Sequence, residues 1–366
     1  MLKLLHGGHT GASSLSVIIC SHNPRADYLH RVLESLKAQT LPTEAWELLL
    51  VDNASEPRLA TSWDLSWHPN HTHVREDELG LTPARVRGIQ ESVGGMLVFI
   101  DDDNVLAPDY LERVFSLERA HPHLGLFGAG VLTPEFEVQP TAEMEPWLHM
   151  LALRTVSRSR WTNNPKDTAC VPWGAGLCVT RQIATAYLEW VRVLNVSNML
   201  DRLGEEHLFC GGDDLFSFAS ARVGSGFGLF PELRITHLIR PHRLTEAYLL
   251  RLVHDHAYSH GVLRYLLFGE DPRNLDVLEA VRILLHGMRR GRLSMRCRLA
   301  AARGRQRALL SITRQGMCPV QNGHVPTVHS RRTVVGHAAV DVAAKPAAVS
   351  NARTGFLLTV AASLFS

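Results

Sequence analysis

Three consecutive carboxylates, Asp101, Asp102 and Asp103, are the residues of this sequence best suited to chemistry. They directly follow the apolar stretch 96–100, which predicts a buried strand. Because adjacent carboxylates repel one another and have low strand propensity, folding stability alone does not favour them here. Carboxylates at the carboxyl end of a strand can hold a hard divalent cation, which can in turn hold a diphosphate. The alternative is a solvated turn whose acidic residues cap the helix predicted to begin near Pro108.

Two further apolar stretches are followed by polar residues in the same way. Residues 15–20 and 46–51 predict strands, and they lead into Ser21-His22-Asn23 and Asp52-Asn53. Helical spacing of apolar residues between the strands predicts βαβ units, a parallel sheet and the α/β fold class. Since parallel strands bring their carboxyl ends to one edge, these polar residues are expected to line a pocket together with the three carboxylates. A plain turn role remains open, because Asn, Asp and Ser all favour turns.

Asp52 and Arg85 are the side chains most suited to a nucleotide. Asp52 is short, lies at a strand end and can accept a hydrogen bond from a ring N–H, although an Asx turn would also explain it. Arg85 lies in a helix predicted over residues 81–93, and its guanidinium can neutralise a diphosphate or stack on a base. The alternative for Arg85 is an exposed helix arginine.

The second half of the chain contains residues suited to a second substrate. Gly174 and Gly176 precede a predicted strand, and their lack of a side chain would let the backbone approach a sugar closely. Trp173 has a flat apolar face that suits a pyranose ring and suits a hydrophobic core equally well. Asp213 and Asp214 follow two glycines and open a predicted helix, where acidic residues commonly serve the helix dipole.

Four successive motifs resemble those of family 2 glycosyltransferases of the GT-A fold: Ser16–Asn23, Val51–Ser55, Gly80–Arg85 and Asp101–Asp103. The resemblance extends over residues 15–250 and implies a Rossmann-like mixed, mainly parallel sheet flanked by helices. It also implies that the first half of this region binds a nucleotide-sugar. Val86 departs from the family pattern, in which an asparagine often follows the arginine.

The resemblance implies individual roles at the donor site. Asp52 would accept a hydrogen bond from the base, uracil in most members, and Arg85 would lie near the base or the diphosphate. Asp101 would contact the ribose or the sugar, and Asp103 would bind a divalent metal, Mg²⁺ or Mn²⁺. The other residues expected at the donor site are Ser21, Asn23 and Asp102.

Further roles follow from the resemblance in the second half. The Gly-Gly-Asp-Asp segment at 211–214 resembles the family's catalytic-base element, which makes Asp214 the expected base and Asp213 the reserve. The segment 235–245 resembles the family's closing segment, in which a histidine adds a metal ligand. His237 matches that position best and His242 less well, and a hydrogen-bonded structural imidazole is the alternative. Trp173, Gly174 and Gly176 would form the acceptor and sugar pocket.

Together these expectations describe an inverting, metal-dependent glycosyltransferase of polysaccharide biosynthesis. It would move a sugar from a UDP-linked donor to a hydroxyl of a glycan or lipid-linked glycan. The metal would stabilise the leaving diphosphate, and the carboxylate base would deprotonate the acceptor in one in-line displacement.

Two alternatives belong to other classes. A sugar nucleotidyltransferase normally has a glycine-rich basic loop after the first strand, and Ser21-His22-Asn23-Pro24 is not such a loop. A sensor would bind a nucleotide-sugar in the same pocket without turning it over.

The charge balance changes sharply along the chain. Residues 280–366 contain fourteen basic residues and one acidic residue, Asp341, whereas residues 1–279 contain 24 basic and 35 acidic residues. An amphipathic helix is predicted over residues 275–290, and arginines alternate with apolar residues beyond it. A basic amphipathic segment suits the surface of an anionic membrane, and a solvated basic helix is the alternative. Nucleic acid is not expected as a partner, because no aromatic interleaving accompanies the arginines.

Composition and motifs divide the chain into four parts: a flexible leader at 1–14, the glycosyltransferase domain at 15–250, a basic helical extension at 251–314 and a loosely structured tail at 315–366. Six scattered cysteines without a CxxC pair indicate neither a zinc site nor a disulfide framework. The sequence shows no signal peptide and no apolar run long enough to span a bilayer. We therefore expect a cytoplasmic protein, peripheral on the inner face of the membrane.

Overall fold

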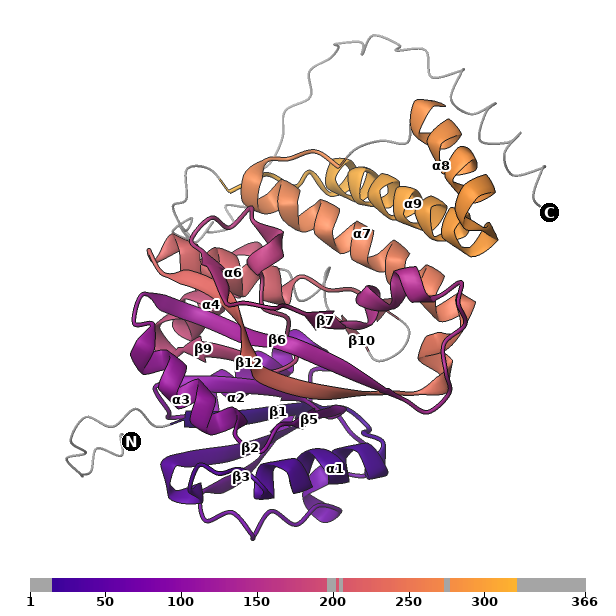
Figure 1. The fold of residues 1–366 in the computed structure, drawn as a ribbon. Helices are drawn as coiled ribbons and strands as arrows, with labels where there is room; N and C mark the ends of the chain where they lie inside the picture. The colour runs from indigo at the N-terminus through magenta and orange to yellow at the C-terminus, as the bar shows by residue number, and fades with distance from the viewer. Residues whose placement is uncertain (1–14, 196–201, 204–206, 273–276, 321–366) are drawn as a thin grey trace, which may run out of the picture. The chain divides into compact units, whose positions relative to one another are not determined.

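The computed structural model describes residues 15–195, 202–203, 207–272 and 277–320 (Figure 1). The chain divides into two units, Met1–Pro326 and Thr327–Ser366, and every element below belongs to the first. The predicted leader and most of the predicted tail lie outside the described residues.

A mixed sheet forms the centre of the fold. Its strands follow the order β3 (His71–Glu76), β2 (Trp46–Asn53), β1 (Leu15–Ser21), β4 (Met96–Asp101), β9 (Leu177–Thr180), β6 (Leu124–Phe136), β12 (Gly226–Ile239) and β5 (Asn104–Leu106). The first four are parallel, β9 is antiparallel to both of its neighbours, and β5 is antiparallel to β12. Two short strands, β7 (Arg154–Thr155) and β8 (Arg160–Thr162), pair with β6 and β12. The predicted α/β class with a mixed sheet is confirmed.

Strand β1 shows why the continuous apolar runs of this sequence become central strands. Successive side chains of a strand point to opposite faces, and both faces of β1 are covered. Val17 and Ile19 contribute to one apolar cluster, while Ile18 between them contributes to the other. A strand buried on both faces favours apolar residues, which explains the run from Val17 to Cys20; the buried Ser16 donates a hydrogen bond to Glu47.

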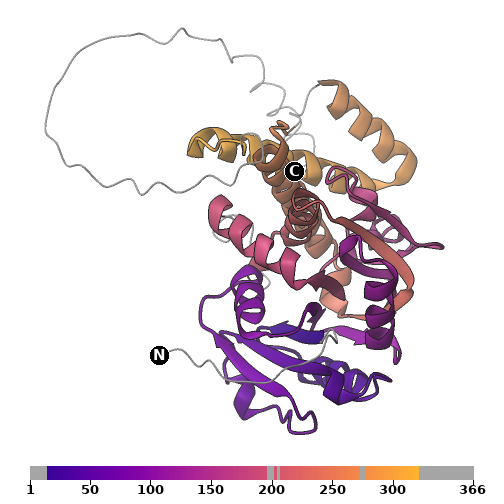
Figure 2. The same cartoon turned by 90° about the vertical axis from the view of Figure 1, so that its left-hand side faces the viewer.

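Helices cover the two faces in separate groups. On the face of Val17 and Ile19 lie α1 (Ala26–Lys37) and α3 (Tyr110–Ala120). On the face of Ile18 lie α2 (Leu81–Glu91), α4 (Arg181–Leu194) and α6 (Gly212–Arg222). Figure 2 shows this layering from the side.

Helix α7 (Glu246–Phe268) joins the sheet domain to the basic helices. It runs through residue 250, where the sequence predicted the domain to end, and buries Val262 and Leu263 in the same cluster as α4 and α6. Helix α9 (Arg292–Gln315) packs along α7, and α8 (Val277–Arg290) packs on α9 (Figures 1 and 2). Helices α7, α9 and α8 therefore extend the packing of the sheet domain, each on the one before. Within the described residues, no helix combines the length and apolar composition needed to cross a bilayer.

The crossing of α9 over α7 predicts a stability effect at Gly304. A Cβ atom on Gly304 would lie 2.2 Å from the carbonyl oxygen of His254, so Gly304→Ala must push the helices apart. Overpacking of this kind costs about 1–3 kcal/mol, although alanine at an open helical site is favoured over glycine. Thermal unfolding followed by circular dichroism should show a lower Tm for Gly304→Ala. Gly95→Ala is the control, because a Cβ there meets nothing within 4 Å; equal Tm values would contradict so close a crossing.

Candidate active site

The ends of the parallel strands meet at one sheet edge, as the strand pattern predicts. Ser21 at the end of β1 lies opposite Asp52 of β2, and Cys20 lies opposite Asp101 of β4. The hydroxyl of Ser21 donates a 2.5 Å hydrogen bond to Asp102 Oδ2. Three of the predicted donor-site segments are therefore joined at this edge.

The three carboxylates concentrate negative charge at the edge. Burial raises the pKa of Asp102 to about 6; the nearby charges of Asp103 and Asp101 add to the rise, and the Ser21 hydrogen bond and Arg243 oppose it. A carboxyl group whose pKa rises in this way lacks sufficient positive charge around it. A cation bound beside it would relieve that deficit.

Asp103 is held by residues from the far end of the domain. Its side chain is buried, and Oδ2 lies 3.0 Å from Arg243 Nη2 and 3.4 Å from His237 Nε2. Oδ1 accepts a 2.9 Å hydrogen bond from the side chain of Asn104. Antiparallel pairing of β5 with β12 creates this arrangement, since it places His237 opposite Asn104. The predicted pair Asp103 and His237 is thus brought together.

These residues fit a divalent cation shared with a diphosphate. Among the described residues, no three His, Cys, Asp or Glu side chains form a metal-binding group. Mg²⁺ commonly takes only one or two protein carboxylates and completes its shell with water and substrate phosphate oxygens. Asp103 provides such a carboxylate, and Asn104 Oδ1 is a buried oxygen with no hydrogen-bond partner in the part of the chain that the structure describes. A cation there would depend on the nucleotide for the remainder of its ligands.

Asp213 connects the second half of the chain to the same edge. Its Oδ1 lies 3.1 Å from Arg85 Nη1, and its Oδ2 accepts a 2.8 Å hydrogen bond from the backbone N–H of Gly174. Burial lowers the pKa of Arg85, but the charges of Asp213, Tyr187 and Asp101 outweigh burial and hold it above its ordinary range. The charged form of Arg85 is therefore stabilised both by Asp101 at the end of β4 and by Asp213 at the start of α6.

Asp214 lies in the first turn of α6 and differs from its neighbour in its surroundings. Burial raises the pKa of Asp214 to about 7; Asp213 adds to the rise, and Arg264 opposes it. A general base works best when its pKa is close to the working pH. Asp213, by contrast, already accepts hydrogen bonds on both oxygens. The surroundings suit Asp214 to proton transfer and Asp213 to positioning.

Asp52 and Asn23 organise the loop that follows β2. Asp52 accepts hydrogen bonds from the backbone N–H groups of Ser55 and Leu59 and from Arg75. Asn23 accepts a hydrogen bond from the backbone N–H of Glu56. The Ser55 side chain is a further hydrogen-bond partner of Asp52, so the roughly four hydrogen bonds that a carboxylate can accept are all supplied by the protein in this structure. The nucleotide contacts of both residues stay predictions.

In this structure the two glycines of the predicted acceptor pocket make room for protein side chains. A Cβ on Gly174 would lie 2.1 Å from Arg85 Nη2, so glycine here lets Arg85 reach Asp213. Gly176 has φ of +71°, and Tyr110 donates a 2.7 Å hydrogen bond to its carbonyl oxygen. Arg85 thus lies against Gly174, and Tyr110 lies against Gly176. Contact of these glycines with a sugar stays a prediction.

Sequence reasoning missed two arginines. The guanidinium of Arg154 lies 3.3 Å from the centre of the Trp173 ring, and burial together with Arg160 lowers the pKa of Arg154 to about 9. Arg154 is on the two-residue strand β7, which has no recognisable sequence signal. Arg243 follows His237 by six residues, and its position in a predicted closing segment was the available signal.

Comparison with known proteins supports the predicted family. The model of "Glycosyl transferase family 2" matches residues 16–165. An uncharacterized glycosyltransferase of Haemophilus influenzae is 31% identical over 110 residues, which cover 30% of this chain and 36% of that protein. The amylovoran biosynthesis glycosyltransferase AmsE of Erwinia amylovora is 24% identical over 197 residues, covering 51% of this chain and 72% of that protein. The chain thus spans about a third of the first of these relatives.

Solved structures show a weaker likeness. The mannosyltransferase PcManGT of Pyrobaculum calidifontis, solved in complex with GDP-Man and Mn²⁺, is 16% identical. That match covers 84% of this chain and 77% of that chain, with a TM-score of 0.46.

Proposed function

Residues 16–165 belong to glycosyl transferase family 2, and from this premise we propose that the protein is an inverting glycosyltransferase. The proposed donor is a UDP-linked sugar, and the proposed acceptor is a hydroxyl of a glycan or lipid-linked glycan. The observation that carries the proposal is Arg85, which lies 3.1 Å from Asp213 at the start of α6 and is electrostatically stabilised by Asp101 at the end of β4. This link supports a single site that contains both acidic donor-binding residues and a carboxyl group suited to act as a base.

In the proposed reaction Asp214 takes the proton of the acceptor hydroxyl as that oxygen attacks the anomeric carbon. The bond from that carbon to the diphosphate breaks in the same step, which inverts the configuration. Asp213 holds Arg85 and the backbone of Gly174 in place beside the base. Asp103 and His237 would hold a divalent cation, Mg²⁺ or Mn²⁺, which when bound supplies positive charge to the departing diphosphate.

A donor panel tests the proposal. Purified protein is incubated with radiolabelled nucleotide-sugars and Mn²⁺, with hydroxyl acceptors present or absent, and both binding and product are measured. Transfer from one UDP-sugar that is lost in Asp103→Asn supports the proposal. Binding without turnover identifies a sensor, and formation of a nucleotide-sugar from a sugar phosphate and a nucleoside triphosphate identifies a nucleotidyltransferase.

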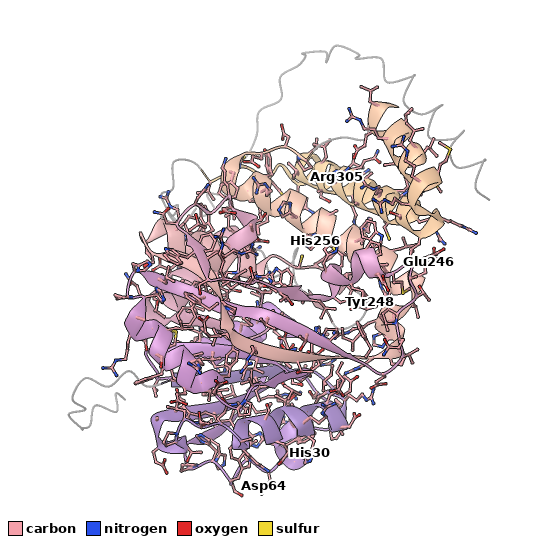
Figure 3. All side chains as sticks on the ribbon, viewed as in Figure 1. His30, Asp64, Glu246, Tyr248, His256 and Arg305 are labelled. Atoms are coloured by element: carbon pink, nitrogen blue, oxygen red, sulfur yellow. The ribbon has the colours of Figure 1, made fainter. Side chains whose placement is uncertain are left out.

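An anionic membrane is the proposed surface on which the protein meets a lipid-linked acceptor. Helix α8 packs on α9 and buries Ile283, and it leaves a set of large apolar side chains exposed: Leu278, Val281, Leu284, Leu285 and Met288. Residues 277–320 contain ten arginines and one acidic residue, Glu279, which pairs with Arg305 of α9. Arg305 is labelled on α9 in Figure 3. Apolar side chains beside arginines suit the boundary between anionic headgroups and acyl chains.

Vesicle binding tests this surface. We expect the wild-type protein to sediment with vesicles of phosphatidylcholine and phosphatidylglycerol, and the double variant Leu285→Asp, Met288→Asp to remain in solution. Each aspartate removes buried apolar area and adds charge of the wrong sign. The control is Val93→Asp, which changes an exposed apolar residue that follows α2. Equal sedimentation of the α8 variant and the control would exclude α8 as the membrane contact.

A further inference from the structure

Arg243 occupies the space between the two side chains expected to bind a cation. It lies in the short 3₁₀ turn Pro241–Leu244, between the end of β12 and the start of α7. Its side chain is 18% exposed, with Nη2 3.0 Å from Asp103 Oδ2 and Nη1 3.1 Å from His237 Nε2. One guanidinium therefore contacts both residues at once.

The contacts use the same lone pairs that a metal would use. A guanidinium can only donate, so His237 Nε2 must accept from Arg243 and the imidazole proton must lie on Nδ1. Metal binding to His237 and Asp103 would need that nitrogen lone pair and the Oδ2 lone pairs. Arg243 and a cation at this position are therefore mutually exclusive.

The negative charge around Asp103 favours either positively charged occupant, the Arg243 guanidinium or a divalent cation. Asp101, Asp102 and Asp103 place up to three negative charges beside one guanidinium, and burial of that guanidinium is possible because of them. A divalent cation on Asp103 would repel Arg243 at short range. The planar fork of arginine matches two phosphate oxygens, and a diphosphate bound to the cation would lie next to the displaced side chain.

We propose that Arg243 occupies the cation site in the donor-free protein, is displaced by the divalent cation and then binds the diphosphate of the donor. The proposal rests on the proposed function for the identity of the diphosphate. Its first half, competition between Arg243 and the cation, concerns the protein without any nucleotide. Arg243 is then a donor-binding residue that also keeps Asp103 and His237 in position before the donor arrives.

Mn²⁺ binding to the nucleotide-free protein tests the competition. The free Mn²⁺ signal in electron paramagnetic resonance gives the affinity of each variant. Loss of the contacts to Asp103 and His237 should raise the Mn²⁺ affinity of Arg243→Gln by about tenfold. Arg251→Gln is the matched control, because it removes an exposed arginine of α7. Arg243→Lys keeps the charge and should stay close to the wild type.

UDP binding in saturating Mn²⁺ tests the second half. We expect Arg243→Gln and Arg243→Lys each to bind UDP about tenfold more weakly, because neither offers the planar fork. An unchanged or lower Mn²⁺ affinity in a folded Arg243→Gln protein would overturn the competition. Unchanged UDP affinity would overturn the diphosphate contact. Neither result depends on transfer activity, so failure of the donor panel and failure of this proposal are separate outcomes.

Discussion

Asp214→Asn should abolish sugar transfer, leave UDP binding unchanged and raise the Tm of the protein at pH 8. A general base contributes about 10²–10⁴-fold to a rate, and an amide cannot accept the acceptor proton. UDP affinity should persist because the donor-site contacts proposed above do not include Asp214. Transfer rates, isothermal titration with UDP and thermal unfolding are the three measurements.

The stability effect follows from the raised pKa of Asp214. Its pKa in the folded protein is about 7, above the ordinary value of 3.8, so the folded state binds more protons than the unfolded state between these values. The stability of the wild type should therefore decrease as pH rises through this window. The neutral amide in the Asp214→Asn variant carries no such penalty, so the gain in Tm should be largest above pH 7 and vanish near pH 4.

The pH dependence of the wild-type rate provides a further check. Below the pKa of the base, kcat/KM should fall about tenfold per pH unit, and it should level off above pH 7. A folded Asp214→Asn protein with wild-type transfer rates, or an unchanged Tm at pH 8, would remove Asp214 from the role of base.

Asp213→Asn should have the opposite effect on stability. The side chain of Arg85 is only 5% exposed, and replacing the carboxylate beside it removes a charged hydrogen bond worth about 1.5–3 kcal/mol. The backbone N–H of Gly174 loses a charged acceptor in the same change. Thermal unfolding should therefore show a Tm several degrees below that of the wild type, with UDP binding weakened through the displaced Arg85.

The two variants form a matched pair, because adjacent aspartates receive the same substitution. Opposite shifts in Tm identify Asp213 as the positioning residue and Asp214 as the carboxyl group whose pKa is raised by burial. If both variants shift Tm in the same direction, the contrast drawn from their surroundings fails. If Asp213→Asn alone abolishes transfer while folded, the reserve assignment from the sequence becomes the better one.

The sequence by itself determined the N-terminal parallel strands of the sheet and the edge at which the candidate site lies, whereas the long strands β6 and β12 were not predicted. Mainly apolar runs such as 15–20 and 96–100 have local signatures, because a strand buried on both faces favours apolar residues. The topology of parallel strands then brings Ser21, Asp52 and Asp101 to one edge, whatever their partners are. The resemblance to family 2 glycosyltransferases was likewise readable from motifs in their order along the chain, and the model of that family matches residues 16–165.

Tertiary structure alone decided which charged groups meet at that edge. Arg85 and Asp213 are 128 residues apart, and Asp103 meets His237 and Arg243 only because β5 pairs with β12. Periodicity reports burial within one element, whereas an ion pair depends on where two distant elements are packed. Packing of distant elements also bears on residue 250, where the resemblance to the family ends. Helix α7 spans this position, buries Val262 and Leu263 in one cluster with α4 and α6, and packs along α9. The domain boundary at residue 250 stays a prediction.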